Sequence, residues 1–293
     1  MSEMTVAANS ASLPEASAPA LRAHLSGVAF TSPDPQRLSN FYVDAMGYER
    51  LSATDTWLGT LDGRWISARE GEGNAIDYVA FALTGAEGLA ALKERLSRAS
   101  VAFEEVADAT AFDSAIRLKD PDGNGLVFGI PKPIIEPLAE AAPCRLQHVV
   151  FASDETPAMV WFYCDILGFA PSDYVRDAEG DLTSAFLRCS TEHHSLAVFR
   201  APRKRLDHVC YDVEDWARIR DWADRFAALH VALQWGPGRH GPGNNLFFFV
   251  NDPDGNWLEF SAELEHVEGA RDIKHWAHEE RTLNSWGGAI MRS

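Results

Sequence analysis

Short segments in which apolar and polar residues alternate recur along this chain, and two stretches with helical spacing interrupt them in each half. In the first half the pattern predicts helices over 32–46 and 86–98 and strands over 27–31, 57–61, 64–68, 76–83, 101–105, 115–119 and 125–130. In the second half it predicts helices over 156–167 and 216–229 and strands over 146–152, 172–175, 182–188, 195–200, 206–212, 231–235, 245–250 and 257–262. The order lacks long parallel βαβ spacing and indicates an α+β fold of tandem βαβββ modules with helices outside.

The second half repeats the first, which predicts two domains. Asp-Pro-Asp-Gly-Asn occurs at 120–124 and again at 252–256, each time between two apolar strands. Pro fixes such a turn, and Gly accepts the positive φ that closes the hairpin. A Pro-rich stretch over 131–143 indicates a linker. The expected divisions are a disordered lead over 1–20, a metal-free first domain over 21–135, a catalytic second domain over 144–265 and a tail over 266–293, helical and then irregular.

Three strand positions carry metal-binding residue types in the second half only. They are His148, His208 and Glu259, which align with Gly27, Tyr78 and Val127 of the first half. Strand faces alternate with period two, so we expect each to point the way its neighbours two residues away point, into the interior. Those neighbours are Leu146 and Val150, Leu206 and Cys210, and Trp257 and Ser261.

A carboxylate in such an interior is costly to leave ionised, and a divalent cation offsets that cost. Two His and one carboxylate with open positions are the ligand set of non-haem Fe(II) oxygenases. The repeat therefore predicts a metal site in the second domain and no metal in the first.

Composition excludes several classes of protein. The net charge of -17 argues against binding to nucleic acid or to anionic membrane surfaces. No apolar run approaches a membrane span, and the start of the chain lacks the basic and apolar regions of a signal peptide. All four cysteines lie in the second half without a CxxC pair, a pattern typical of reduced thiols in a cytoplasmic enzyme.

Over about residues 22–285 the chain resembles the two-domain type I extradiol ring-cleavage dioxygenases of the vicinal oxygen chelate superfamily. The resemblance is most specific from Gly238-Arg239-His240 through the segment 248–255 to Glu259. It implies half-open β-barrels, metal ligands His148, His208 and Glu259, an acid/base His194 and a second substrate-side His240. It also implies bound Fe(II), or Mn(II) in some members, insertion of both atoms of O2 beside an aromatic diol, and a homo-oligomer.

One position departs from that family's pattern. The family has Tyr where this chain has Phe249, so a hydroxyl donor is missing. Three explanations stay open: His240 acts alone, another tyrosine reaches the site, or the substrate is a para-diol such as a hydroquinone or a gentisate-like ring. The candidate tyrosines are Tyr163, Tyr174 and Tyr211.

The expected pocket has an aromatic lining, which suits a planar ring. Its predicted members are Val150, Phe186, Trp235 and Phe249, with Leu283 and Trp286 as a lid. No cation at a matched position demands a substrate carboxylate, and the remaining candidates for that task are Arg203, Lys204 and Arg239. His193 should face away from His194 on an extended segment and have a structural role.

Two other functions fit the same scaffold. One is a metal-dependent isomerase, lyase or thiol transferase of the glyoxalase kind, whose sites are built mainly from metal carboxylates, so His194 and His240 argue against it. The other is a protein that sequesters an aromatic ligand, as drug-resistance members of the superfamily do. Those proteins lack the three metal ligands, so the presence of His148, His208 and Glu259 here argues against a sequestering role.

Overall fold

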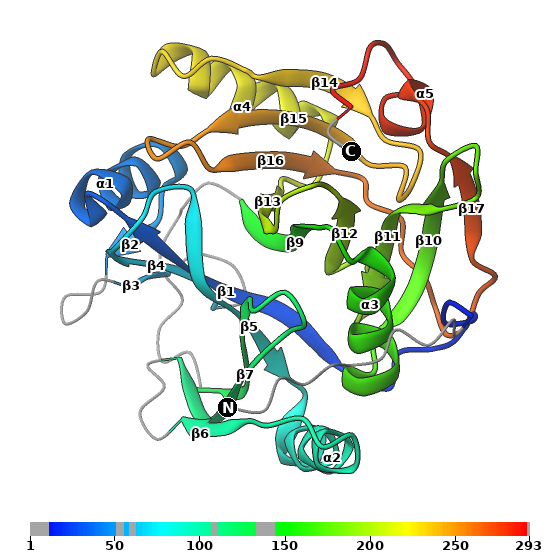
Figure 1. Cartoon of the computed structure of the whole chain (residues 1–293). Coiled ribbons are helices and arrows are strands. Elements are labelled where there is room, and N and C mark those ends of the chain that lie inside the picture. Colours follow the sequence, from blue (N-terminus) through cyan, green and yellow to red (C-terminus); the bar gives the residue numbers. More distant parts are fainter. Residues whose placement is uncertain (1–11, 51–55, 59–62, 107–110, 133–143, 292–293) are drawn as a thin grey trace.

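The computed structural model describes residues 12–50, 56–58, 63–106, 111–132 and 144–291, so the expectations for 1–11 and for the linker over 133–143 lie outside the described residues. Each repeat builds one mixed sheet, which confirms the α+β prediction of tandem modules. Figure 1 shows the two sheets side by side with the longer helices at the periphery.

The first repeat forms a sheet of eight strands in the order β2-β3-β4-β1-β5-β8-β7-β6. Its elements are β1 (Ala23–Ser32), α1 (Pro35–Met46), β2 (Glu49–Arg50), β3 (Thr56–Leu58), β4 (Trp65–Glu70), β5 (Ala75–Leu83), α2 (Gly85–Arg98), β6 (Glu104–Val106), β7 (Phe112–Lys119) and β8 (Gly125–Pro131). Antiparallel pairing of β1 with β5 joins the two modules of this repeat.

The second repeat forms a sheet of nine strands in the order β14-β15-β16-β13-β9-β12-β11-β10-β17. Its elements are β9 (Arg145–Ser153), α3 (Thr156–Trp161), the π-helix η1 (Phe162–Leu167), β10 (Ala170–Arg176), β11 (Leu182–Arg188), β12 (Leu196–Arg200), β13 (Arg205–Asp212), α4 (Trp216–Ala228), β14 (Trp235–Arg239), β15 (Leu246–Asn251), β16 (Trp257–Ala262), β17 (Lys274–Ala277) and α5 (Glu280–Leu283). Here β9 pairs with β13 as β1 pairs with β5, so the duplication extends to topology.

The second domain differs from the predicted elements in three places. The helix expected over 156–167 is α-helical only to Trp161 and continues as a π-helix before Gly168, whose φ of 91° ends it. The sequence pattern predicts a strand over 231–235, but the strand β14 begins at Trp235 and continues to Arg239. This Gly- and Pro-rich segment can form a strand because it lies at the edge of the sheet, where the missing N–H of a proline is tolerated. The tail, expected to be helical, adds β17 alongside β10 and only then a short helix.

The repeated turns hold the two domains together in a pseudo-symmetric way. The Tyr42 hydroxyl donates to Asp252 Oδ2 at 3.4 Å, and the Tyr163 hydroxyl donates to Asp120 Oδ2 at 2.9 Å. Each hydroxyl comes from the helix of one repeat and each carboxylate from the turn of the other. One apolar core continues through both repeats, so the second sheet is supported from behind by the first domain.

In the first repeat an indole ring fills the place that corresponds to the predicted metal site. A Cβ added to Gly27 would lie 2.2 Å from Cε2 of Trp65, so no larger side chain fits there. Trp65 belongs to a small apolar cluster with Ala29, Ala80 and Val127. The equivalent space in the second repeat holds polar side chains instead.

Candidate active site

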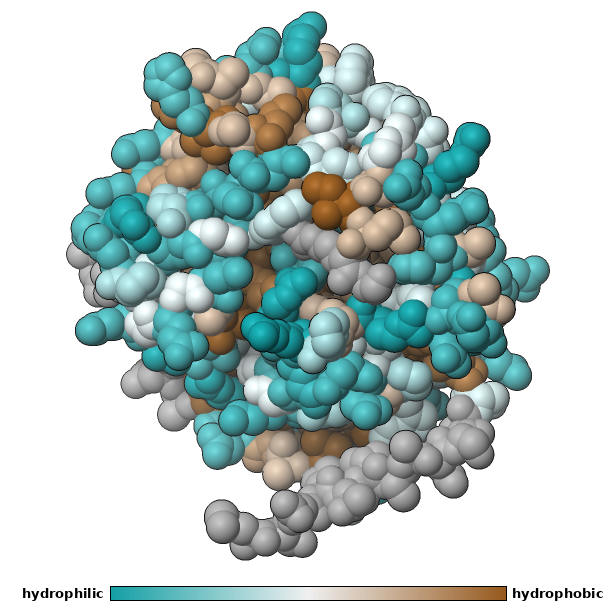
Figure 2. Space-filling model, turned by 45° about the horizontal axis from the view of Figure 1, so that its top comes forward, coloured by the Kyte–Doolittle hydropathy of each residue, from teal (hydrophilic) through white to brown (hydrophobic). Residues whose placement is uncertain are grey.

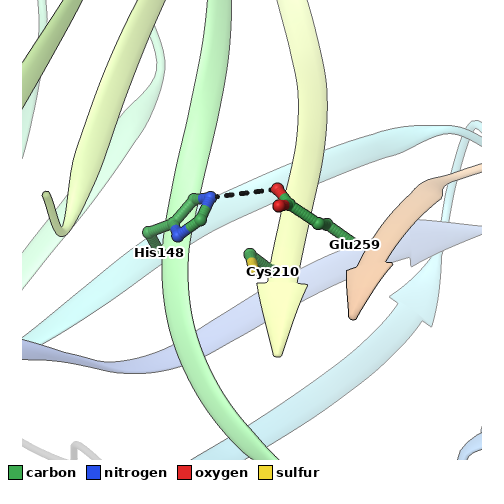
Figure 3. Close-up of side chains that lie close together, drawn as sticks. All are labelled: His148, Cys210 and Glu259. Carbon is green, nitrogen blue, oxygen red and sulfur yellow. Dashed lines mark ion pairs between the residues drawn. The ribbon is translucent and has the colours of Figure 1, made fainter. Parts of the chain in front are cut away.

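His148, His208 and Glu259 come together from the adjacent strands β9, β13 and β16. His208 Nε2 lies 3.1 Å from Glu259 Oε2, and His148 Nε2 lies 3.3 Å from the same oxygen. Each of the three residues is at most 5% exposed. Figure 3 shows the His148 ring and the Glu259 carboxylate facing each other across β13.

A β-bulge directly before each histidine aims its ring. Gln147 is the extra residue on β9, and Asp207 is the extra residue on β13. An extra residue reverses the alternation of side chains, so Leu146 and Leu206 point into the core behind the sheet. The expectation that these two leucines share a face with the histidines is therefore wrong. For Glu259 the alternation holds, because β15 and β16 pair without a register shift.

The same two bulges occur in the first repeat. Ser26 is the extra residue on β1 and Asp77 is the extra residue on β5, at the positions of Gln147 and Asp207. The irregular register is therefore common to both repeats, and in the second repeat the residues directly after the two bulges are histidines.

Hydrogen bonds hold two of the three side chains in place from behind. His208 Nδ1 lies 2.8 Å from Asp207 Oδ1, and Asp207 also pairs with Arg205 at 3.1 Å. Asn245 Nδ2 donates to Glu259 Oε1 at 3.1 Å. Such outer contacts orient metal ligands and fix the tautomer of a ligand histidine.

The donor set fits a divalent cation. A carboxylate only accepts hydrogen bonds, so the Nδ1 of His208 beside Asp207 carries hydrogen and a neutral His208 has a bare Nε2. That lone pair faces Glu259 Oε2 at 3.1 Å, an arrangement that is repulsive unless a proton or a cation lies between the atoms. Two imidazole nitrogens and a carboxylate oxygen that converge in this way suit a metal with mixed N/O preference.

The pKa directions have the same origin. Burial alone would raise the pKa of Glu259, but contacts with His148, His208 and His240 hold that pKa well below its usual range. Burial lowers the pKa of His148. For His208, burial would lower the pKa, but Asp207 and Glu259 raise it overall. These shifts favour the ionised form of Glu259, the neutral form of His148 and the protonated form of His208.

Cys210 also borders this group, which sequence reasoning missed as a possible ligand. One ligand atom each of His148, Cys210 and Glu259 lie within 4.8 Å of one another. Burial and the nearby Glu259 raise the pKa of the thiol well above its usual range, and a neutral thiol is a poor ligand. Its Sγ also donates weakly to Gln147 Oε1 at 3.8 Å.

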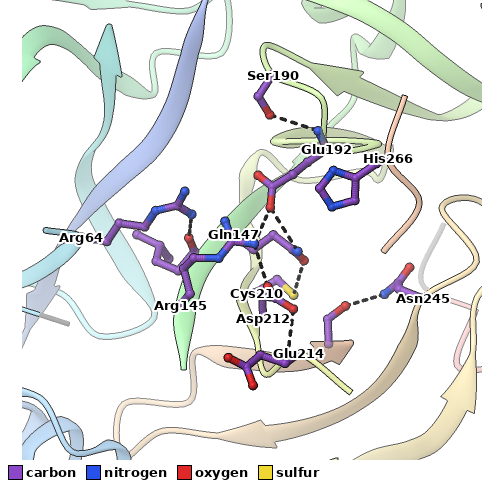
Figure 4. A network of polar contacts seen from close by, with 12 residues as sticks. Arg64, Arg145, Gln147, Ser190, Glu192, Cys210, Asp212, Glu214, Asn245 and His266 are labelled. Carbon is purple, nitrogen blue, oxygen red and sulfur yellow. Dashed lines mark hydrogen bonds and ion pairs between the residues drawn. The ribbon is translucent and has the colours of Figure 1, made fainter. Parts of the chain in front are cut away.

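A polar network anchors the back of β9 and β13 (Figure 4). Arg145 pairs with Glu192 at 2.6 Å and with Asp212 at 2.7 Å, and the bulged Gln147 donates to Glu192 Oε1 at 3.4 Å. Because these contacts satisfy the amide of Gln147 on the side away from the pocket, they stabilise the bulge that turns His148 inward.

The three side chains line one common pocket. Its walls include all four residues expected there, Val150, Phe186, Trp235 and Phe249. The tail closes one side with His278, Thr282, Leu283 and Ile290. Leu283 thus lies where the expected lid lies, whereas Trp286 is 54% exposed and packs against Trp216 outside the pocket.

His194 and His240 both line this pocket. The His194 ring lies 4.1 Å from the His148 ring, and burial and the neighbouring histidines hold the pKa of His194 well below its usual range. His240 Nε2 lies 3.4 Å from Glu259 Oε1, and its Nδ1 donates to the carbonyl of Leu283. The His240 ring stacks on Phe247 with centroids 3.8 Å apart, which fixes its plane.

Phe249 lies in the pocket wall beside the metal-ligand candidates. Its ring meets the His208 ring edge to face at 5.2 Å and stacks on Trp235 at 5.3 Å. None of the three tyrosines considered as substitute donors lines the pocket: Tyr163 donates to Asp120, Tyr174 donates to the carbonyl of Pro14, and Tyr211 is buried against Phe260. That explanation for the missing hydroxyl is therefore wrong.

Within the described part of the chain, no lysine or arginine lines the pocket. Arg239 pairs with Glu263 at 2.7 Å, and Lys204 pairs with Asp122 at 2.9 Å, so both are engaged elsewhere. Hydrophilic residues cover most of the outer face in Figure 2, interrupted by apolar residues toward its top. Among the described helices, none combines the length and the apolar character that crossing a bilayer requires.

Comparison with known proteins gives matches over most of the chain. The family model described as Glyoxalase/Bleomycin resistance protein/Dioxygenase superfamily matches residues 145–260. The chain is 28% identical over 240 residues to the iron-dependent extradiol dioxygenase of Rhodococcus jostii (strain RHA1), covering 74% of this chain and 79% of that protein. It is 24% identical over 277 residues to the manganese-dependent 2,3-dihydroxybiphenyl 1,2-dioxygenase of Geobacillus genomosp. 3, covering 82% and 88%. Homoprotocatechuate 2,3-dioxygenase from Arthrobacter globiformis has the same fold, with a TM-score of 0.82, 21% identity, and coverage of 95% of this chain and 91% of that chain.

Proposed function

The chain belongs to the two-domain type I extradiol dioxygenases of the glyoxalase/bleomycin resistance/dioxygenase superfamily, and on that premise we propose that it uses Fe(II) to cleave the ring of an uncharged catechol-type diol in aromatic catabolism. Extradiol ring cleavage of a catechol-type substrate by O2 is the activity of this family. The observation that carries the metal proposal is the convergence of His148 Nε2 and His208 Nε2 on one oxygen of Glu259, at 3.3 and 3.1 Å.

The proposed metal ligands are His148, His208 and Glu259. When bound, iron held by two imidazoles and one carboxylate offers open positions where a diol and O2 can meet. One relative is named as iron-dependent and another as manganese-dependent, so the mixed N/O ligand set is compatible with either metal. We propose Fe(II) because this facial set is typical of non-haem iron oxygenases.

The remaining polar groups of the pocket have proposed roles in proton transfer. His194, neutral and buried beside His148, suits a base that takes a proton from one hydroxyl of the diol. His240, held by the Leu283 carbonyl and by Phe247, suits a contact with the second oxygen. With the candidate tyrosines engaged elsewhere, His240 has this task without help from a phenol hydroxyl.

The pocket favours a substrate without a carboxylate. A buried anionic group needs a paired cation, and the described lining offers no arginine or lysine. Phe186, Phe199, Trp235, Phe249 and Trp257 offer aromatic and apolar surface around the predicted ring site. A catechol with an alkyl or aryl substituent therefore fits better than one with an acidic side chain.

The test is oxygen uptake by protein loaded anaerobically with Fe(II), with absorbance followed for a ring-opened product. The substrates are catechol, 3-methylcatechol, 2,3-dihydroxybiphenyl, a catechol with a carboxymethyl group, hydroquinone and gentisate, and His148→Ala is the control. Uptake on uncharged ortho-diols that His148→Ala abolishes is expected. Uptake only on para-diols would mean that Phe249, where the family has Tyr, accompanies a change of substrate from ortho- to para-diols. No uptake by protein that holds one iron per chain would overturn the proposal and favour an isomerase or a binding protein.

Two further properties belong to the same proposal. All four cysteines are free and buried, which suits a reducing compartment, and we propose a cytoplasmic location. We also propose a homo-oligomer, as is common in this family. Sedimentation equilibrium of the full-length protein tests the second point, and a single species at the mass of one chain would contradict it.

A further inference from the structure

A row of buried acid and imidazole side chains lies behind the pocket and ends at His194. Asp173 Oδ1 lies 3.2 Å from His193 Nε2, and His193 Nδ1 lies 3.0 Å from His194 Nδ1. Asp173 and His193 are fully buried, and His194 is 3% exposed. We propose that Asp173 and His193 are positioning residues that hold His194 in the tautomer whose Nε2 is bare toward the pocket. The role of His194 as a base toward the diol rests on the proposed function, but the assignment of its tautomer does not.

Asp173 is ionised and accepts hydrogen bonds on both of its oxygens. Its Oδ1 accepts a hydrogen bond from Arg271 Nη2 at 2.7 Å, and its Oδ2 accepts one from Trp276 Nε1 at 2.7 Å. Burial would raise the pKa of this carboxyl, but His193, Trp276 and Arg271 lower it overall. Asp173 is therefore an ionised acceptor, and two residues of the tail, Arg271 and Trp276, hold it in place.

The Asp173 carboxylate decides which ring nitrogen of His193 carries the hydrogen. Its Nε2 makes no aligned hydrogen bond, and the atom 3.2 Å away is a carboxylate oxygen. A lone pair on that nitrogen would be repelled by Asp173, whereas an N–H is attracted. His193 therefore carries its hydrogen on Nε2, and its Nδ1 is bare when the ring is neutral.

The tautomer of His193 in turn fixes which ring nitrogen of His194 carries hydrogen. Two ring nitrogens 3.0 Å apart need one hydrogen between them. Since His193 Nδ1 is bare, the hydrogen is on Nδ1 of His194. A neutral imidazole has one N–H, so Nε2 of His194 is left with a lone pair.

The backbone around His193 is built for this contact, and the prediction that it faces away from His194 is wrong. The segment bends at His193 instead of continuing a strand. Its N–H donates to the Glu265 carbonyl at 2.8 Å, and its carbonyl accepts from Ser172 Oγ at 2.6 Å. Gly243 adopts a φ of +77°, and a Cβ there would lie 3.2 Å from His193 Nδ1, so the ring fits against a bare backbone.

In the proposed reaction the proton balance is simple. The hydroxyl proton of the diol moves to Nε2 of His194, the O–H bond breaks, and its electron pair stays on the diol oxygen. The resulting imidazolium keeps its Nδ1–H toward His193, with the Asp173 carboxylate behind. An acid that orients and stabilises a histidine base has the same logic in serine hydrolases.

Two substitutions at one position separate this role from a merely structural one. In His193→Asn the amide can place an oxygen near the former Nδ1 and still accept from His194. In His193→Gln the amide reaches toward Asp173 and leaves His194 without its partner. Both variants lose the ring, so a packing role would affect them alike.

The first readout is the tautomer, measured by ¹⁵N NMR of histidine side chains in the metal-free, full-length protein. We expect His194 to carry hydrogen on Nδ1 in the wild type and in His193→Asn, and to shift toward Nε2–H in His193→Gln. A wild-type His194 with hydrogen on Nε2 would overturn the proposal. This readout is independent of whether the protein cleaves diols.

The second readout is turnover of the Fe(II)-loaded enzyme on its best ortho-diol. We expect kcat of His193→Gln to fall roughly tenfold to a hundredfold with little change in KM, and kcat of His193→Asn to stay within a few-fold. Equal losses in both variants would overturn the positioning role. If His193→Gln fails to fold by circular dichroism, Asp173→Asn provides the same comparison, with a tautomer shift as the expected result and an unchanged tautomer as the contradicting one.

Discussion

Asp207 and His208 are consecutive in the chain, yet their side chains meet: Asp207 Oδ1 lies 2.8 Å from His208 Nδ1. On a regular strand consecutive side chains point to opposite faces, so this contact depends on the bulge at Asp207. Asp77 is the extra residue at the equivalent bulge of the first repeat, and it pairs there with Arg69 and Arg117. The same irregularity thus supports an ion pair in one domain and a candidate metal ligand in the other.

Replacing Asp207 with Asn should weaken metal binding without unfolding the protein. The amide can still contact His208 but no longer carries the charge that favours Nδ1–H, and loss of such an outer contact typically costs ten- to a hundredfold in metal affinity. Anaerobic titration with Fe(II) measures the dissociation constant. Asp77→Asn is the matched control and should leave both affinity and stoichiometry unchanged. Equal affinity in Asp207→Asn and wild type would contradict the role assigned to Asp207.

The metal-site candidates could be predicted from sequence because their residue types conflict with the apolar strands around them and because the first repeat supplies a comparison. The detailed register could not. Period-two alternation gave Leu146 and His148 the same face, and only the pairing of β9 with β13 reveals the extra residue between them. Cys210 could not be recognised as part of the group from sequence, since nothing in its local sequence distinguishes a thiol near a site from a core thiol.

Composition also concealed two elements of the second domain. The segment Trp235–Arg239 contains two glycines and a proline, which suggest a loop, but as the edge of the sheet it needs hydrogen bonds on one side only. The strand Lys274–Ala277 has little apolar pattern of its own, and contacts such as Trp276 with Asp173 fix its place. Tertiary contacts decided both elements, whereas the helices and inner strands follow their local pattern.

Enlarging Gly27 to Ala should destabilise the first domain. The new Cβ would lie 2.2 Å from the buried Trp65 ring, and overpacking of this kind costs about 1–3 kcal/mol. Gly88→Ala is the control, because its Cβ would meet only Leu83 at 3.8 Å and alanine favours a helix. Urea unfolding should show a lower unfolding free energy for Gly27→Ala alone. A stability equal to that of the wild type would mean that Trp65 can move out of this space.

The carboxyl of Asp252 should make stability depend on pH. Burial raises its pKa from 3.8 to about 6 in the folded protein, even though Asn256 lowers it. Between these values the folded state binds more protons than the unfolded state, so this group's stabilising contribution is present at low pH and is lost as pH rises through about 6. The expected loss is about 1.4 kcal/mol per pH unit within that window.

Asp252→Asn removes this titration, and comparison with wild type isolates it from other carboxyls. The stability of the variant minus that of the wild type, measured as the free energy of unfolding, should increase as pH rises from about 4 to about 6.5 and then level off. Urea unfolding at several pH values measures the difference. A difference that is constant with pH would show that Asp252 titrates alike in the folded and unfolded states.

Phe249→Tyr should reveal whether His240 acts alone at the substrate oxygen. Phe249 lies against His208 and Trp235 in the pocket wall. A hydroxyl at its para carbon would therefore add a phenol donor to a pocket whose described lining contains no tyrosine. Because Nδ1 of His240 already donates to the Leu283 carbonyl, His240 can donate to a substrate oxygen only from Nε2 of its imidazolium form. Loss of one donor at an oxygen that gains charge can cost roughly a hundredfold in kcat, so His240→Ala should lower kcat by that order. In the His240→Ala background, Phe249→Tyr should recover part of the loss on ortho-diols, and in the wild-type background it should change kcat little. Initial rates of product formation at saturating diol measure all four proteins. A large gain from Phe249→Tyr alone would instead mean that the wild-type pocket lacks a donor its ortho-diol needs, and would favour a para-diol as the natural substrate.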